Sequence, residues 1–227
     1  MKIAEVKACV FDAYGTLFDV NSSAEQARLQ LGARWVELAN LWRLKQLQYT
    51  WLRGLGNRLA DFWSVTGDAL DFAMASMDIR DEPLRERLMG LYRTLRCYPD
   101  VPDVLRELRS QGLRLAILSN GTSEMLASAV GHGGLEGLFD HVLSVEEVGV
   151  YKPHPSVYGL AAARLGMRPV EACFVSSNGW DACAAQANGF RAAWCNRTAQ
   201  QPERIPDAPE VMLGDLRGLP DLLRPAL

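Results

Sequence analysis

Hydrophobic and polar residues alternate along the chain in blocks that predict strands separated by helices. Short apolar runs of strand length recur, and stretches with helical periodicity lie between them. The predicted strands are Ala8–Phe11, Leu113–Leu118, His141–Ser144, Ala172–Val175 and Ala192–Cys195. The predicted helices between them are Val101–Gln111, Ser123–Gly131, Ser156–Leu165 and Asp181–Asn188. This alternation predicts an α/β fold with a Rossmann-like, doubly wound parallel sheet.

The interval between the first two predicted strands is too long for one crossover helix and contains no convincing strand. Its patterns predict helices at Glu25–Leu31, Trp35–Leu52, Arg58–Met74 and Pro83–Leu95. We therefore expect an all-helical cap domain at 19–97, inserted into a discontinuous core of 1–18 and 98–227. A cap that emerges at the strand-end face excludes water from a site beneath it. The polar, proline-rich stretch Asn196–Pro209 predicts a surface loop.

Composition limits the class of protein. The 227 residues are 48% hydrophobic and carry a net charge of −3, so there is no polybasic footprint for nucleic acid or an anionic membrane. No apolar run is long enough to span a membrane, and charged residues precede the first apolar stretch, unlike in a signal peptide. The five cysteines form no Cys-x-x-Cys pair, and the three histidines form no metal-binding pair. We expect a cytoplasmic protein with reduced thiols and no metal.

Polar side chains follow four predicted strands, at the edge of the sheet where ligands bind. Asp12 follows the first strand, and a carboxylate there is costly to bury unless it has partners or a task. Nucleophilic attack is the most natural task for it. The other three segments are Ser119-Asn120-Gly121, Tyr151-Lys152-Pro153 and Ser176-Ser177-Asn178-Gly179-Trp180-Asp181. Their convergence predicts a site with two carboxylates and an ammonium.

Each of these residues also has a purely structural interpretation. Ser119 and Asn120 suit a turn, and Asp181 suits the N-terminus of the helix that follows it. Lys152 before Pro153 suits an exposed position. The occurrence of four polar segments in the right order favours chemistry over capping alone.

The motifs Asp12-Ala13-Tyr14-Gly15-Thr16-Leu17, Leu118-Ser119-Asn120-Gly121, Tyr151-Lys152-Pro153 and Ser176 to Asp181 resemble those of the haloacid dehalogenase superfamily, over nearly the whole chain. Within it, the sequence is most similar to the L-2-haloacid dehalogenases. Phosphatases of the superfamily carry a second aspartate where Tyr14 stands, and paired acids where Ser177 and Asn178 stand. Fewer acids mean fewer of the oxygen ligands that magnesium prefers.

The resemblance implies an activity and a mechanism. The enzyme would convert short L-2-haloalkanoic acids to D-2-hydroxy acids and halide through an ester on Asp12, with no cofactor and no metal. Lys152 would keep Asp12 ionised, and Thr16 would hold its rotamer. Asp181 would activate the hydrolytic water, with Ser176 and Asn178 positioning it.

The resemblance also implies a set of substrate-binding residues. Ser119 and Asn120 would bind the substrate carboxylate together with backbone amides near Tyr14, and Arg43 would reach the halide from the cap. The residues that would line the rest of the pocket are Tyr14, Leu47, Phe62, Tyr158 and Trp180. Without the resemblance, Arg43 would be taken for a solvated helix residue, Phe62 for cap core and Tyr158 for a structural residue. Leu44 departs from the glutamine often found after that arginine.

Two other functions remain open from the sequence. A small-molecule phosphatase on the same fold would need magnesium, and a non-catalytic binding protein would tolerate loss of Asp12. A fluoroacetate-type defluorinase is a variant of the dehalogenase activity that the resemblance implies. The resemblance implies a homodimer, in which Trp35, Trp42 and Trp51 of the cap either form the contact surface or bury within the cap itself.

Overall fold

A parallel sheet of six strands forms the centre of the computed structural model, which describes residues 3 and 6–224. The strand order is β3-β2-β1-β4-β5-β6, and every neighbouring pair is parallel. The strands are β1 (Ala8–Phe11), β2 (Arg114–Ser119), β3 (His141–Ser144), β4 (Ala172–Ser176), β5 (Arg191–Cys195) and β6 (Val211–Leu213). The predicted α/β class and parallel sheet are confirmed. The predicted core also includes 1–2, 4–5 and 225–227, which lie outside the described residues.

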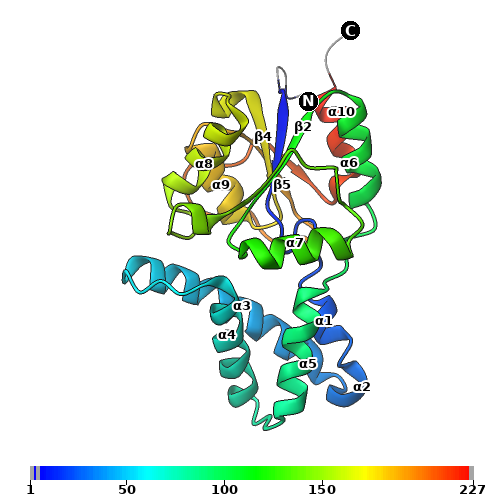
Figure 1. Ribbon diagram of the computed structural model, residues 1–227, viewed down its shortest axis with the longest axis vertical. Helices are drawn as coiled ribbons and strands as arrows, with labels where there is room; N and C mark the ends of the chain where they lie inside the picture. The colour runs from blue at the N-terminus through cyan, green and yellow to red at the C-terminus, as the bar shows by residue number, and fades with distance from the viewer. Residues whose placement is uncertain (1–2, 4–5, 225–227) are drawn as a thin grey trace.

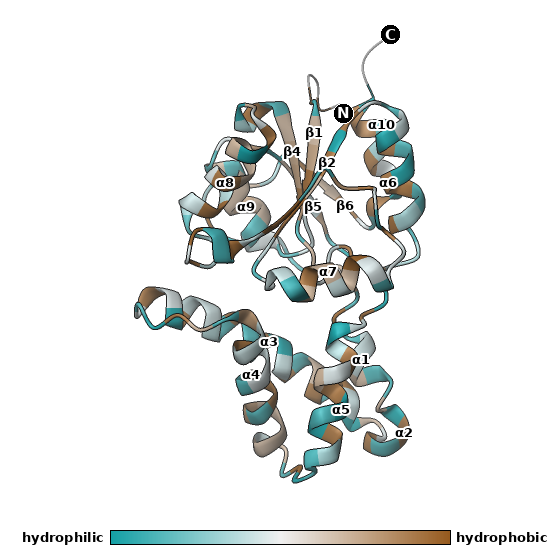
Figure 2. Cartoon of the chain, viewed as in Figure 1, coloured by the Kyte–Doolittle hydropathy of each residue, from teal (hydrophilic) through white to brown (hydrophobic). Residues whose placement is uncertain are grey.

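Helices cover the sheet on both sides. α8 (Pro155–Leu165) and α9 (Gly179–Ala187) lie on one side, and α6 (Val101–Ser110) and α10 (Leu219–Leu223) lie on the other (Figure 1). α7 (Ser123–His132) lies near the ends of the strands. The central strands are fully buried and mostly hydrophobic along their whole length, as expected for a parallel sheet enclosed by helices (Figure 2).

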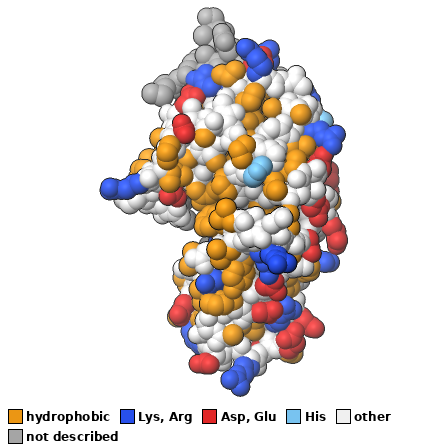
Figure 3. Space-filling model, turned by 90° about the vertical axis from the view of Figure 1, so that its left-hand side faces the viewer, with side chains coloured by type: hydrophobic (Ala, Val, Ile, Leu, Met, Phe, Trp, Pro, Cys, Tyr) orange, Lys and Arg blue, Asp and Glu red, His pale blue; other side chains and the backbone are white. Residues whose placement is uncertain are grey.

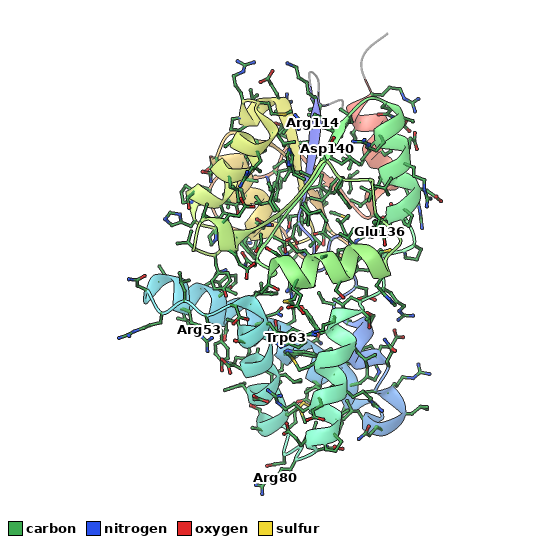
Figure 4. The ribbon with its side chains drawn as sticks, viewed as in Figure 1. Arg53, Trp63, Arg80, Arg114, Glu136 and Asp140 are labelled. Carbon is green, nitrogen blue, oxygen red and sulfur yellow. The ribbon has the colours of Figure 1, made fainter. Side chains whose placement is uncertain are left out.

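Five helices between β1 and α6 form a separate bundle below the carboxyl ends of the strands (Figure 1). They are α1 (Ser22–Glu25), α2 (Arg28–Leu31), α3 (Arg34–Leu55), α4 (Phe62–Ser76) and α5 (Glu82–Arg93). Figure 4 shows Arg80 at the far end of this bundle and Trp63 near its junction with the sheet domain. At that junction the Arg93 guanidinium lies 4.3 Å from the centre of the Trp63 ring.

Two predictions about local structure were wrong, and one strand was not predicted. The stretch 25–31 is not one helix, because a turn at Gln26 and Ala27 separates the end of α1 at Glu25 from α2. α4 begins at Phe62 and not at Arg58, because the Asp61 carboxylate caps the helix by accepting from the Ser64 amide at 2.8 Å. β6 was not predicted; it has three residues, and Met212 within it is exposed. No helix in the described part of the chain is both long and apolar enough to cross a membrane.

Candidate active site

Asp12 lies directly after β1 and is buried, with 6% of the residue exposed. Its Oδ2 accepts from Thr16 Oγ1 at 3.0 Å and from Asn178 Nδ2 at 3.1 Å. Its Oδ1 accepts from Lys152 Nζ at 3.1 Å. β1 lies between β2 and β4, so the residues after these strands reach it from either side. Three predicted residues therefore touch the predicted nucleophile.

Lys152 lies between two buried carboxylates. Its Nζ donates to Asp12 at 3.1 Å and to Asp181 Oδ2 at 2.9 Å, and its side chain is 1% exposed. Burial alone would lower the pKa of Lys152, but the charges of Asp12 and Asp181 outweigh it and raise that pKa. The lysine therefore stays charged, and the alternative of an exposed lysine is excluded.

Asp181 lies in the first turn of α9 and is fully buried. Its Oδ1 accepts from the Tyr158 hydroxyl at 2.7 Å. Burial raises the pKa of Asp181, and Lys152 and Tyr158 only partly oppose the rise. A carboxylate with a raised pKa is a stronger base than an ordinary one, which suits the abstraction of a proton from water.

Two predicted contacts differ from the structure. Ser176 was expected to position Asp181, but its Oγ accepts from the Asn178 amide at 3.1 Å, because the turn after β4 brings that amide back over it. Tyr158 was predicted to bind substrate, but it is fully buried and its hydroxyl donates to Asp181. Ser176 therefore contacts the backbone of the turn after β4, and Tyr158 contacts the Asp181 side chain.

Ser119 and Asn120 follow β2 and are almost completely buried. Ser119 Oγ accepts from the Gly121 amide at 3.1 Å, which leaves its hydroxyl proton to donate. Asn120 Oδ1 accepts from the Lys152 amide at 3.0 Å, which orients the side chain so that its Nδ2 is the group that can bind an anion.

Arg43 reaches the strand ends from α3. Its Nη2 donates to the Tyr14 carbonyl at 3.1 Å and lies 3.4 Å from Asn178 Oδ1. Asn178 also donates to Asp12, so the guanidinium lies one side chain away from the predicted nucleophile. The interpretation of Arg43 as a solvated helix residue is therefore wrong.

Aromatic rings form one wall beside Asp12. The Tyr14 ring stacks on Tyr92 at 5.6 Å and lies 5.8 Å from Phe62, which in turn is 6.3 Å from Tyr151. A Cβ on Gly121 would lie 2.6 Å from the Tyr14 ring, so glycine is needed for this close approach. Burial raises the pKa of Tyr14 well above its ordinary value, so the phenol stays neutral.

The other predicted pocket residues lie along α3 and α9. Leu47 is half-buried one turn after Arg43 on the same helix. Trp180 is half-buried with its ring edge-on to Trp51 at 5.3 Å. Both tryptophans line a cavity of 590 Å³ between the end of α3 and the sheet domain. Figure 3 shows this side of the molecule, with hydrophobic side chains where the two parts meet.

Leu44 lies away from this cavity. It is 49% exposed and borders a shallow groove on the outer face of α3 with Val36 and Leu41. The departure from glutamine at this position therefore does not change the lining of this cavity.

Sequence reasoning missed an ion pair that braces the loop after β1. Arg197 donates to the Thr16 carbonyl from Nη2 at 2.9 Å and binds Asp100 through both terminal nitrogens at 3.0 Å. Burial opposes ionisation of Asp100, but Arg197 and the Leu216 amide outweigh it and lower its pKa. The position of Arg197 just after β5, at the same edge as the other site residues, was the available signal. The sequence instead predicts that Arg197 belongs to the surface loop Asn196–Pro209.

Ser177 was also left without a role. Its amide donates to Thr16 Oγ1 at 2.8 Å, and its Oγ lies 3.2 Å from the same oxygen. Among the described residues, no three or more His, Cys, Asp or Glu side chains are grouped as a metal site.

Comparisons with known proteins place these residues in a family. The model of the haloacid dehalogenase-like hydrolases matches residues 6–189. The chain is 45% identical over 220 residues to (S)-2-haloacid dehalogenase 1 of Pseudomonas sp. strain CBS-3. The aligned region covers 96% of this chain and 96% of that one. A solved dehalogenase with an intermediate complex matches with a TM-score of 0.95 and 41% identity, over 98% of this chain and 99% of that one. The L-2-haloacid dehalogenase of Xanthobacter autotrophicus with covalently bound chloropropionic acid matches with a TM-score of 0.89 and 38% identity, over 96% of this chain and 98% of that one.

Proposed function

Because the chain belongs to the haloacid dehalogenase-like hydrolase family, we propose that it hydrolyses short L-2-haloalkanoic acids to D-2-hydroxy acids and halide. The observation that carries this proposal is the buried Asp12 carboxylate, held by Lys152, Thr16 and Asn178 at the carboxyl end of β1. A carboxylate that is paired with a cation, desolvated and fixed in orientation is a competent nucleophile toward carbon.

The hydrogen bonds distinguish the two oxygens of Asp12. Oδ2 accepts from two neutral donors, Thr16 and Asn178, whereas Oδ1 accepts from Lys152. Oδ1 therefore keeps a lone pair for in-line attack on C2 as the carbon–halogen bond breaks. The product of this step is an ester through Oδ1 and a free halide, with inversion at C2.

Hydrolysis of the ester restores the enzyme. Asp181 accepts a proton from water, and the hydroxide attacks Cγ of Asp12. The negative charge then develops on Oδ2, where Thr16 and Asn178 already donate. Cleavage of the Cγ–Oδ1 bond releases the 2-hydroxy acid, which takes up the proton from Asp181. The regenerated Asp12 carboxyl then releases the second water proton to solvent. C2 is not attacked again, so the inverted configuration is kept.

Substrate recognition uses the remaining polar groups. Ser119 and Asn120 bind the substrate carboxylate, and Arg43 meets the departing halide, while Tyr14, Phe62, Leu47 and Trp180 surround C2. Residues 19–97 act as the cap that closes the site. The reaction requires no metal, because the single leaving anion can be stabilised by fixed donors and the Arg43 charge.

The first experiment measures halide release from each enantiomer of 2-chloropropionate in excess EDTA, with Asp12→Asn as a matched control. We expect chloride from the L-enantiomer only, D-lactate as the product, and no turnover by the variant. Chloride release that needs magnesium, or phosphatase activity on phosphate esters with magnesium, would contradict the proposal.

We also propose a cytoplasmic homodimer. Five free cysteines support a reducing compartment, and exposed apolar side chains on α3, Val36 and Leu44 among them, support a contact surface there. Trp42 does not belong to that surface, because it is buried and donates to the Thr66 carbonyl. Light scattering of the wild type and of Leu44→Glu tests the dimer, and a monomeric wild type would contradict it.

A further inference from the structure

Gln46 is a buried amide in the helical bundle that the proposed mechanism does not use. It lies on α3 three residues after Arg43 and is 1% exposed. A buried amide is costly unless its donors and acceptor are satisfied. Its Oε1 accepts from Arg43 Nη1 at 2.7 Å, and its Nε2 donates to Thr66 Oγ1 at 2.7 Å.

The direction of the Gln46 amide is determined by Thr66. The Thr66 hydroxyl donates its one proton to the Phe62 carbonyl at 2.6 Å, so it can only accept from Gln46. Gln46 must therefore present its NH₂ group to Thr66 and its oxygen to Arg43. The Tyr92 hydroxyl, 3.0 Å from Nε2, holds the amide from a third helix, α5.

The Arg43 guanidinium is held at both ends. Nη1 is fixed by Gln46 in the bundle, and Nη2 contacts Tyr14 and Asn178 at the strand ends. A half-buried arginine has many rotamers, and a fixed partner removes most of that freedom. Without Gln46, the guanidinium would lose its 2.7 Å hydrogen bond to the bundle and keep its contacts to Tyr14 and Asn178 and its interaction with Tyr92.

We propose that Gln46 is a positioning residue that aims Arg43 at the departing halide and so determines how well poor leaving groups are displaced. This inference rests on the proposed function. A displacement of about 1 Å in a group of this kind costs up to about a hundredfold in rate. Because the contact to the halide strengthens as the carbon–halogen bond breaks, its loss lowers kcat more than it raises KM.

The test compares two substrates in one enzyme preparation. Chloride is a poorer leaving group than bromide, so its departure depends more on stabilisation of the developing anion. In Gln46→Met, which keeps the volume of the side chain but removes the amide, we expect kcat for L-2-chloropropionate to fall about tenfold or more. The fall for L-2-bromopropionate should be several times smaller, so the bromide-to-chloride ratio of kcat rises.

The ratio distinguishes positioning from a general loss of structure. The concentration of active enzyme cancels from it, so partial unfolding leaves the ratio unchanged. Gln48→Met is the matched control, because Gln48 lies two residues further along α3, on the opposite face. Tyr92→Phe removes one partner of Gln46 and should raise the ratio by a smaller factor.

An active wild type with the same ratio in Gln46→Met would overturn the role of Gln46 and leave the proposed function intact. A wild type that releases no halide from either substrate would instead contradict the proposed function, and this inference with it.

Discussion

Replacement of Lys152 by methionine tests the electrostatic arrangement of the site. The lysine is the cation between the Asp12 and Asp181 carboxylates, at 3.1 and 2.9 Å, and all three groups are buried. Methionine has a similar length and no charge, so Lys152→Met removes the cation with little change in packing. Two buried carboxylates then face each other without compensation.

The expected cost follows from burial. Removal of one partner of a buried ion pair typically costs about 3–5 kcal/mol, because the remaining charge is left desolvated. The variant relieves this cost when one of the two carboxylates takes up a proton, because a like charge nearby raises the pKa of a carboxyl. A protonated carboxyl is neither a nucleophile nor a base. We therefore expect kcat/KM at pH 7 to fall at least about a hundredfold, with partial recovery toward pH 9 as the carboxylates ionise.

Halide release measured between pH 5 and pH 10, together with urea unfolding, checks both parts of this prediction. Lys7→Met is the control, because Lys7 also bonds a carboxylate, Glu171, at 2.6 Å but is 67% exposed. Solvent screens that pair, so its loss should change neither activity nor stability appreciably. The reasoning is refuted if Lys152→Met stays within tenfold of the wild type at pH 7 and its acid limb does not move upward.

Three further predictions concern other residues of the site. Asp181→Asn should stop hydrolysis but permit ester formation, so intact-mass measurement should find the 1-carboxyalkyl group of the substrate on Asp12; an unmodified protein would contradict the role of Asp181. In the wild type, activity should be lost as the pH falls through the raised pKa of Asp181. The acid limb of the kcat profile should therefore lie above the ordinary carboxyl pKa of 3.8, and a limb at or below that pKa would contradict the role of Asp181 as the base. Gly121→Ala should displace the Tyr14 ring and raise KM severalfold with a lower melting temperature, whereas unchanged kinetics would show that the ring does not line the substrate pocket.

Much of the sheet domain could be predicted from the sequence, because buried parallel strands are continuous apolar runs bounded by turn residues. Ala8–Phe11 and His141–Ser144 were predicted with the bounds that the structure has. Val211–Leu213 could not be found in this way, because an exposed edge strand of three residues has no distinctive periodicity. The alternation of strands and helices also predicts which strand ends meet, which is why the Asp12 and Lys152 segments could be placed together.

Contacts between distant helices could not be predicted in this way. The partners of Gln46 come from α4 and α5, and their meeting depends on how the bundle packs. The roles of Ser176 and Tyr158 were assigned by resemblance, which indicates that a residue matters but not which atom it touches. Arg197 was missed because a polar, proline-rich segment predicts a loop whether or not one of its side chains turns inward.

The brace formed by Arg197 has a consequence for biosynthesis. A ribosome makes the chain from its N-terminus, so Asp12 and Thr16 emerge long before Ser177, Asn178 and Arg197, which hold them. β1 must also wait for β4, its neighbour on one side in the finished sheet. A nascent or truncated chain that ends before Arg197 therefore carries the nucleophile without the groups that orient it. Catalytic competence should appear only late in translation, and fragments left by premature termination should be inactive.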